Sequence, residues 1–188
     1  MRPEAPFYVG TTRPSWVGWT RIALTLLFGA VLALVLAQRG LVAAVPPAAG
    51  VFALLALWTW MGQHTRFIVD DRGLTVSLGG FLPRPTWPLA GFRTVQYRIV
   101  PQPAVGASLG GYGWRRGMVI PARPEELRPV GDRKLLTGGE ARQSYRMVVT
   151  RPGTMVEIVG REGTGYLLTP EDPEATAAAI DQAIRARR

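Results

Sequence analysis

Few residues of this sequence have the types and spacing that catalysis or metal binding requires. His64 is the single histidine, and the chain has no cysteine. A lone histidine without a cysteine or carboxylate cluster is a poor metal ligand, so we expect His64 to be an interfacial residue. The sequence therefore predicts no metal and no cofactor.

The other reactive side chains also lack the context of an active site. Neighbouring carboxylates occur at Asp70-Asp71, Glu125-Glu126 and Glu171-Asp172. Acid–base catalysis needs paired carboxylates in a cleft, whereas these pairs fall in a predicted turn, a loop and a helix start. The hydroxyls of Ser108, Ser144 and Thr137 have one possible histidine base in the whole chain. We therefore expect that the protein is not an enzyme.

A glycine-rich segment ends in two arginines. It reads Gly110-Gly111-Tyr112-Gly113-Trp114-Arg115-Arg116. A phosphate-binding loop would need a strand-loop-helix pattern and a Gly-Lys-Ser/Thr ending, and neither follows. Glycines that start a strand or allow close backbone approach are the favoured interpretation. Successive strand residues alternate in direction, so at most one of the two arginines points inward.

Arginine dominates the charge of the chain, which has a formal net charge of +9. Anionic lipid headgroups attract such residues, and the candidate contacts with lipid or a partner are Arg84, Arg93, Arg115 and Arg116. Nucleic acid is not the expected partner, because the arginines are interspersed with acids and no motif with aromatic stacking platforms accompanies them.

Two apolar stretches must position these residues. Ile22 to Ala37 and Leu41 to Met61 contain no charge. Extended back through Trp16, the first stretch gives about 33 Å of helix, which matches a hydrocarbon core of about 30 Å. Prolines 46 and 47 predict a turn over Gln38 to Val45 and a second helix from Pro46, which Gly62 to Thr65 continue.

Two other interpretations of these stretches fit the residues less well. A buried hairpin in a soluble protein would have a polar face, and neither stretch has one. A signal peptide would place a cleavage site at Val35-Leu36-Ala37, but the apolar run is long and a second one follows directly. We therefore expect an integral two-span protein of the cell membrane that contacts lipids through the hairpin.

Arginines and tryptophans predict the orientation. Arg13, Arg21 and Arg66 flank the outer ends of the hairpin, whereas the turn has only Arg39. The positive-inside rule then places both termini in the cytoplasm. The expected membrane-interface residues are Trp16, Trp19, Arg21, Trp58, Trp60 and Arg66.

The domain boundaries follow from composition. Residues 1–15 hold three prolines and predict an irregular cytoplasmic lead-in, 16–65 form the hairpin, and 66–188 form one domain with a loop or insertion at 116–144, including a helical turn at Pro124 to Leu127. The period-two patterns predict a β-hairpin around Asp70 to Gly73, a strand from Phe92 to Val100 and a three-strand meander from Tyr145 to Thr169.

The chain ends in a predicted helix. Asp172 is its N-cap and Pro173 its first residue, and Ala177, Ile180 and Ile184 form an apolar stripe. We expect this helix to be a structural cap of the domain.

The strands, the Gly110 to Arg115 segment and the pattern from Tyr145 to Ile184 resemble the bacterial pleckstrin-homology-like domains. With the preceding hairpin, the chain is similar to small two-span membrane proteins, common in actinobacteria, that carry such a domain. The resemblance implies an α+β membrane protein in which a partly open antiparallel β-barrel or sandwich is capped by the C-terminal helix. It implies protein contacts, assembly or lipid proximity, and no catalysis.

Two functions follow. The first is a non-catalytic, membrane-anchored interaction or scaffolding module whose partner is an unknown protein or a second copy of itself. The second is a binder or sensor of anionic lipid headgroups through the arginines. Clustering of those arginines on a membrane-facing surface would favour the second function, and an exposed apolar edge or groove away from the membrane would favour the first.

Overall fold

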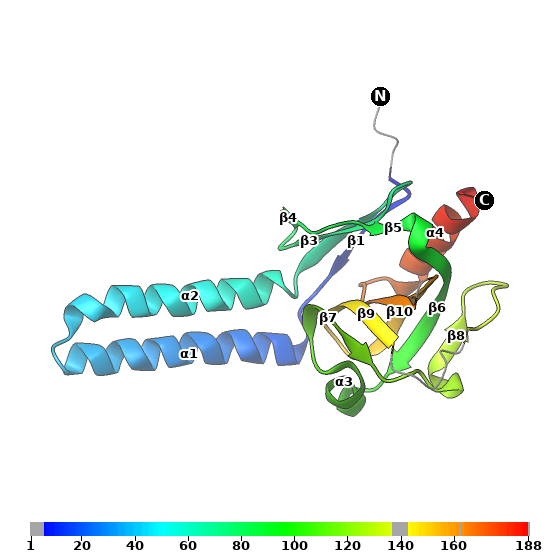
Figure 1. Ribbon diagram of the computed structural model, residues 1–188. Helices are drawn as coiled ribbons and strands as arrows, with labels where there is room; N and C mark the ends of the chain where they lie inside the picture. Colours follow the sequence, from blue (N-terminus) through cyan, green and yellow to red (C-terminus); the bar gives the residue numbers. More distant parts are fainter. Residues whose placement is uncertain (1–5, 137–142, 162, 188) are drawn as a thin grey trace, which may run out of the picture.

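Two long helices project side by side from a domain rich in β-structure (Figure 1). The computed structural model describes residues 6–136, 143–161 and 163–187. Helix α1 spans Trp16–Gln38, and α2 spans Val45–Met61 after a 3-10 turn at Val42–Ala44. Both segments are long and apolar enough to cross a membrane, and little of either is buried. The predicted turn and the prolines in the first turn of α2 are confirmed.

The two helices pack closely at Gly29. A Cβ on this residue would lie 2.6 Å from the Cβ of Phe52 in α2. Small residues permit this kind of close approach between apolar helices. The hairpin is therefore a packed pair.

A pair of strands fixes both ends of the hairpin to the domain. Strand β1, Tyr8–Thr12, directly precedes α1, and β2, Thr65–Val69, follows α2. The two strands are antiparallel, and Thr12 lies opposite Thr65. The buried hydroxyl of Thr12 donates to the carbonyl oxygen of Gln63 over 2.8 Å. Two expectations were wrong here, because residues 8–12 form a strand and α2 ends at Met61.

The smaller sheet has the order β1-β2-β3, and two short strands both pair with β3. Its remaining members are β3 Gly73–Leu78, β4 Leu82–Pro83 and β5 Trp87–Pro88. The predicted β2–β3 hairpin is confirmed. Its turn is closed by Asp70 Oδ1, which accepts hydrogen bonds from the backbone N–H groups of Arg72 and Gly73, both at 3.0 Å.

The larger sheet is mixed, with the order β7-β9-β11-β10-β6-β8. Its strands are β6 Phe92–Val100, β7 Gly113–Val119, β8 Leu127–Pro129, β9 Gln143–Val149, β10 Gly153–Gly160 and β11 Thr164–Leu168. The strand at Phe92 to Val100 and the β10–β11 hairpin are confirmed. The meander is wrong, because β11 lies between β9 and β10 and runs parallel to β9.

Two helical elements lie between strands of the larger sheet in the sequence. Helix α3, Gln102–Leu109, was not expected; it begins after Pro101 and ends at Gly110, which has a φ of 72°. Gly113 then starts β7 with a φ of 113°, and an added Cβ would meet nothing within 4 Å. This glycine therefore serves backbone conformation, not close approach. The predicted helical turn is confirmed as a 3-10 helix at Pro124–Glu126. The prediction of a loop over 116–144 is wrong where β7 continues to Val119 and where β8 forms, and residues 137–142 lie outside the described residues.

The main core lies between the two sheets and helix α4, Pro173–Ala186. Asp172 caps α4 by accepting the N–H of Ala175 at 2.9 Å, as predicted. The side chains of Ala177, Ile180 and Ile184 are buried in this core. A smaller core on the other face of the larger sheet includes Val105 and Leu109 of α3.

The fold is therefore α+β, with two apolar helices, two sheets and a C-terminal helix. In the part of the chain that the structure describes, neither sheet closes into a barrel, and the larger sheet is not purely antiparallel. The expected partly open antiparallel barrel or sandwich is corrected on strand direction, because β9 and β11 are parallel.

Candidate functional site

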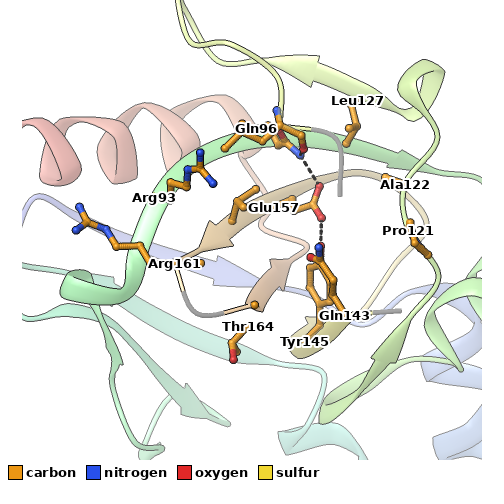
Figure 2. Close-up of a pocket in the computed structure, with 14 residues that line it drawn as sticks. Arg93, Gln96, Pro121, Ala122, Leu127, Gln143, Tyr145, Glu157, Arg161 and Thr164 are labelled. Atoms are coloured by element: carbon orange, nitrogen blue, oxygen red, sulfur yellow. Dashed lines mark hydrogen bonds between the residues drawn. The ribbon is translucent and has the colours of Figure 1, made fainter. Parts of the chain in front are cut away.

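A polar pocket of about 280 Å³ lies on the face of the larger sheet that is turned away from the main core. Figure 2 shows Arg93 and Arg161 on one side of it and Pro121, Ala122 and Leu127 on the other. The side chain of Glu157, only 2% exposed, lies between them. It accepts hydrogen bonds from Gln96 Nε2 at 3.0 Å and from the Tyr145 hydroxyl.

The strand register explains how these groups meet. Gln96 on β6 lies directly opposite Glu157 on β10. Tyr145 lies two strands away on β9, opposite Gly165 of β11. A Cβ at Gly165 would lie 2.3 Å from Tyr145 Cε1. The missing side chain of Gly165 therefore allows the tyrosine ring to cross β11 and reach Glu157.

Glu157 also faces a buried cation. The Arg98 side chain is 1% exposed, with Nη1 3.9 Å from Glu157 Oε1 and Nη2 2.9 Å from the Ile120 carbonyl oxygen. Burial and the negative charge of Glu157 raise the pKa of Tyr145, so its hydroxyl remains a donor at neutral pH. Both carboxylate oxygens of Glu157 have donors, which favours a structural role for this residue. Arg98 Nε and Nη1 are buried without a hydrogen-bond partner among the described residues.

A second cluster lies beside the hairpin and consists of Arg84, Arg116 and Arg146 with Trp58 and Trp114; we call it the basic site. The Arg84 guanidinium carbon lies 4.4 Å from the ring centre of Trp114 in β7 and 5.8 Å from that of Trp58 in α2. Cations over indole rings at such distances are held by cation–π attraction. Arg84 therefore connects the end of α2 to the larger sheet.

The register of β7 and β9 adds two more cations. Arg116 lies directly opposite Arg146 in this antiparallel pair. Side chains in such pairs have Cβ atoms about 5 Å apart, and like charges there are destabilising. A small crevice lined by Trp87, Trp114, Arg116 and Arg146, among others, adjoins Pro85, the residue after Arg84.

None of these three arginines forms an ion pair with an acid among the described residues. Arg84 Nε is buried and has no hydrogen-bond partner among the described residues. Arg84 and Arg146 are partly buried and Arg116 is exposed. Cations placed against each other repel, and an anion between them would reduce this repulsion. The basic site is therefore a cluster of cations without an acidic ion-pair partner among the described residues.

Arg115 points to the other face of β7. Its Nη1 donates to the carbonyl oxygen of Gly110 at the C-terminus of α3, where the helix dipole favours a cation. Burial lowers the pKa of Arg115, and the positive charge of Arg21 in α1 lowers it further. Arg115 therefore lies on the opposite side of the strand from Arg116.

Of the four predicted contact arginines, the structure places Arg84 and Arg116 in the basic site, whereas Arg115 points to the other face of β7. Arg93 is separate, because it is exposed at the mouth of the polar pocket. Arg146 was missed because only the β7–β9 register pairs it with Arg116. The buried network of Gln96, Arg98, Tyr145 and Glu157 was also missed, since its members are far apart in the sequence.

The predicted interface residues lie at the domain end of the hairpin. Trp16 is 83% exposed, and Trp19, Arg21, Trp58 and Arg66 are exposed as well. Trp60 differs, because it is partly buried against the main core and stacks on His64 with ring centres 5.1 Å apart. His64 therefore packs at the junction of α2 and β2.

Residues 106–110 match the Gly-x-Ser-x-Gly pattern of serine hydrolases, which the sequence reasoning missed. Ser108 lies in the last turn of α3, whereas a nucleophile of this class stands on a strand-to-helix turn. Its hydroxyl donates to the Ala104 carbonyl oxygen at 2.5 Å. The pattern here belongs to a helix end.

No protein-family model matches the chain, and neither a curated protein nor a solved structure matches it. The assignment of a function therefore depends on the geometry of the basic site and the hairpin.

Proposed function

We propose that the protein is a non-catalytic, membrane-anchored module that binds anionic lipid headgroups at the surface of its own bilayer. The hairpin α1–α2 spans the membrane, and the basic site holds headgroup phosphate. One observation carries the proposal: Arg116 and Arg146 face each other without an acidic ion-pair partner among the described residues, and Arg84 in the same site contacts a tryptophan of α2.

The attachment of the hairpin supports the anchor. Both helices leave the domain from the paired residues Thr12 and Thr65, so the domain lies directly at the end of the spans. Cleavage of a signal peptide after Ala37 would remove β1, which pairs with β2 over five residues. The strand pair therefore favours a retained membrane hairpin.

The resemblance to pleckstrin-homology-like domains adds to the proposal, since it implies protein contacts or lipid proximity. The mixed sheet departs from an all-antiparallel arrangement, so the basic site carries the argument and the family remains a proposal. A bacterial origin in the actinobacteria is likewise proposed on the resemblance alone.

We expect the charge reversal Arg116→Glu to weaken retention of anionic lipid by roughly tenfold, because each juxtamembrane arginine contributes about 1 kcal/mol and reversal replaces attraction with repulsion. Full-length protein is reconstituted with equal phosphatidylglycerol and phosphatidylcholine and then extracted in mild detergent. Native mass spectrometry counts the retained lipids. The loss should shrink at high salt.

Arg93→Glu is the matched control, since Arg93 is also an exposed strand arginine but lies at the polar pocket. We expect this variant to retain anionic lipid like the parent. Equal loss in both variants would show a general effect of charge, and no loss in either would reject headgroup binding at the basic site.

Both termini are proposed to lie in the cytoplasm. The domain then faces the cytoplasmic leaflet of the membrane, which is rich in anionic lipids. Protease added outside intact cells should therefore leave the domain whole, whereas protease added after permeabilisation should digest it. The reason is the arginine bias of the hairpin flanks. Digestion of the domain in intact cells would show that the domain and both termini lie outside the cell.

A protein-interaction function has one observation in its favour. Strand β1 is an edge of the smaller sheet, and the nearby Phe7 and Val9 side chains are exposed. Unpaired strand edges can accept a further strand from a partner or a second copy. Part of this edge is already occupied, because the Thr11 carbonyl accepts the N–H of Glu171 at 2.9 Å. Crosslinking in native membranes tests this second candidate.

A further inference from the structure

The segment 79–83, which comprises the turn after β3 and the short strand β4, exposes the most accessible large apolar side chain of the described domain. Phe81 is 66% exposed, and Leu82 beside it is also exposed. The neighbouring Gly79 and Gly80 have φ values of 61° and 84°, which form the tight turn. We call residues 79–83 the β3–β4 tip.

The β3–β4 tip is attached to the end of α2. The N–H of Gly79 lies 3.0 Å from the carbonyl oxygen of Met61, the last residue of α2, and 2.8 Å from that of His64. The tip lies on the side of the domain from which the hairpin projects (Figure 1). The position of the tip along the axis of the hairpin is therefore fixed by the end of α2 that carries Trp58 and Trp60.

The residues around the tip match those of a membrane interface. Arg84 follows it directly and contacts Trp58 of α2, with 5.8 Å between the guanidinium carbon and the ring centre. Aromatic residues next to arginines favour the layer between headgroups and acyl chains, where rings leave water and cations remain hydrated. An exposed phenylalanine at this level would otherwise face water.

We propose that the β3–β4 tip is a third membrane contact, with Phe81 and Leu82 inserted into the interfacial layer of the bilayer that the hairpin spans. This inference rests on the proposed membrane anchor but not on headgroup binding by the basic site. Together with the two helices, the tip gives the domain three points of attachment, which fix its tilt over the membrane.

The absence of cysteine allows a site-specific test on the full-length chain. Phe81→Cys is labelled with the fluorophore NBD and reconstituted in vesicles of phosphatidylcholine alone, which removes anionic headgroups from the experiment. Nitroxide lipids with the spin label near the headgroup report contact with the interface, and iodide reports exposure to water. Leu82→Cys repeats the measurement with Phe81 intact.

Two further labelled positions calibrate the result. Gln182 is on the exposed face of α4, so a label on Gln182→Cys gives the signal expected in water. Leu27 is exposed in the middle of α1, so a label on Leu27→Cys gives the signal expected at the bilayer centre. Melting of each labelled protein in detergent confirms folding.

We expect the label at position 81 to be quenched several-fold more by shallow nitroxide lipids than the label at position 182, and to be protected from iodide. Quenching equal to that at position 182, with position 27 still quenched by deep nitroxides, would overturn the third contact and leave the anchor intact. Loss of lipid quenching at position 27 would overturn the anchor and the tip together.

Discussion

Ile180→Asp is expected to destabilise the domain by about 3–5 kcal/mol, because an unpaired carboxylate would replace a side chain that is 0% exposed in the main core. For a chain of this size the shift corresponds to roughly 10 °C in the melting temperature. Thermal unfolding of the full-length protein in detergent, followed by near-UV circular dichroism, measures it.

Gln182→Asp is the control for this substitution, since it introduces the same side chain on the exposed face of α4. Its effect should stay within about 0.5 kcal/mol. Equal melting of the parent and the Ile180→Asp variant would show that α4 is not a structural cap of the domain.

Helix α4 was predictable because all of its signals are local. Asp172, Pro173 and the stripe at 177, 180 and 184 lie within one short segment, and capping and periodicity act over such distances. The apolar helices and the turn at Asp70 to Gly73 were predictable for the same reason. Local chemistry determines these elements without information on the rest of the fold.

Strand order was not predictable in the same way. The turn between β9 and β10 suggested a simple meander, but β11 lies between the two strands. Hydrogen bonds beyond the local sequence hold this arrangement: Thr150 N donates to Thr169 Oγ1 at 2.8 Å, and Arg151 Nη2 donates to the Glu171 carbonyl oxygen at 3.0 Å. Such contacts leave no periodic signal.

The candidate site shows the same division. The sequence indicated Arg84 and Arg116 by their type and position, but Arg146 joins them only through the β7–β9 register. It also grouped Arg93 with them, although β6 places this residue on another part of the domain. Register, which depends on pairing across the sheet, decides which arginines form a site.

The buried network provides the second large effect. We expect Glu157→Leu to destabilise the domain by about 3–5 kcal/mol, because it removes the buried partner of Arg98 and the acceptor of Tyr145 and Gln96. Glu157→Gln should cost less, since its side chain keeps one oxygen acceptor. Thermal unfolding of the full-length protein measures each change.

The double variant Glu157→Leu, Arg98→Met separates charge from packing. Arg98 is 1% exposed, so the single Glu157 variant leaves its cation with Glu126, at 3.6 Å, as the remaining acidic partner among the described residues. Replacing both charges by apolar side chains removes this penalty, and we expect the double variant to recover about 2 kcal/mol or more relative to Glu157→Leu. Additive losses would instead show that Glu157 stabilises the domain through Tyr145 and Gln96, independently of Arg98.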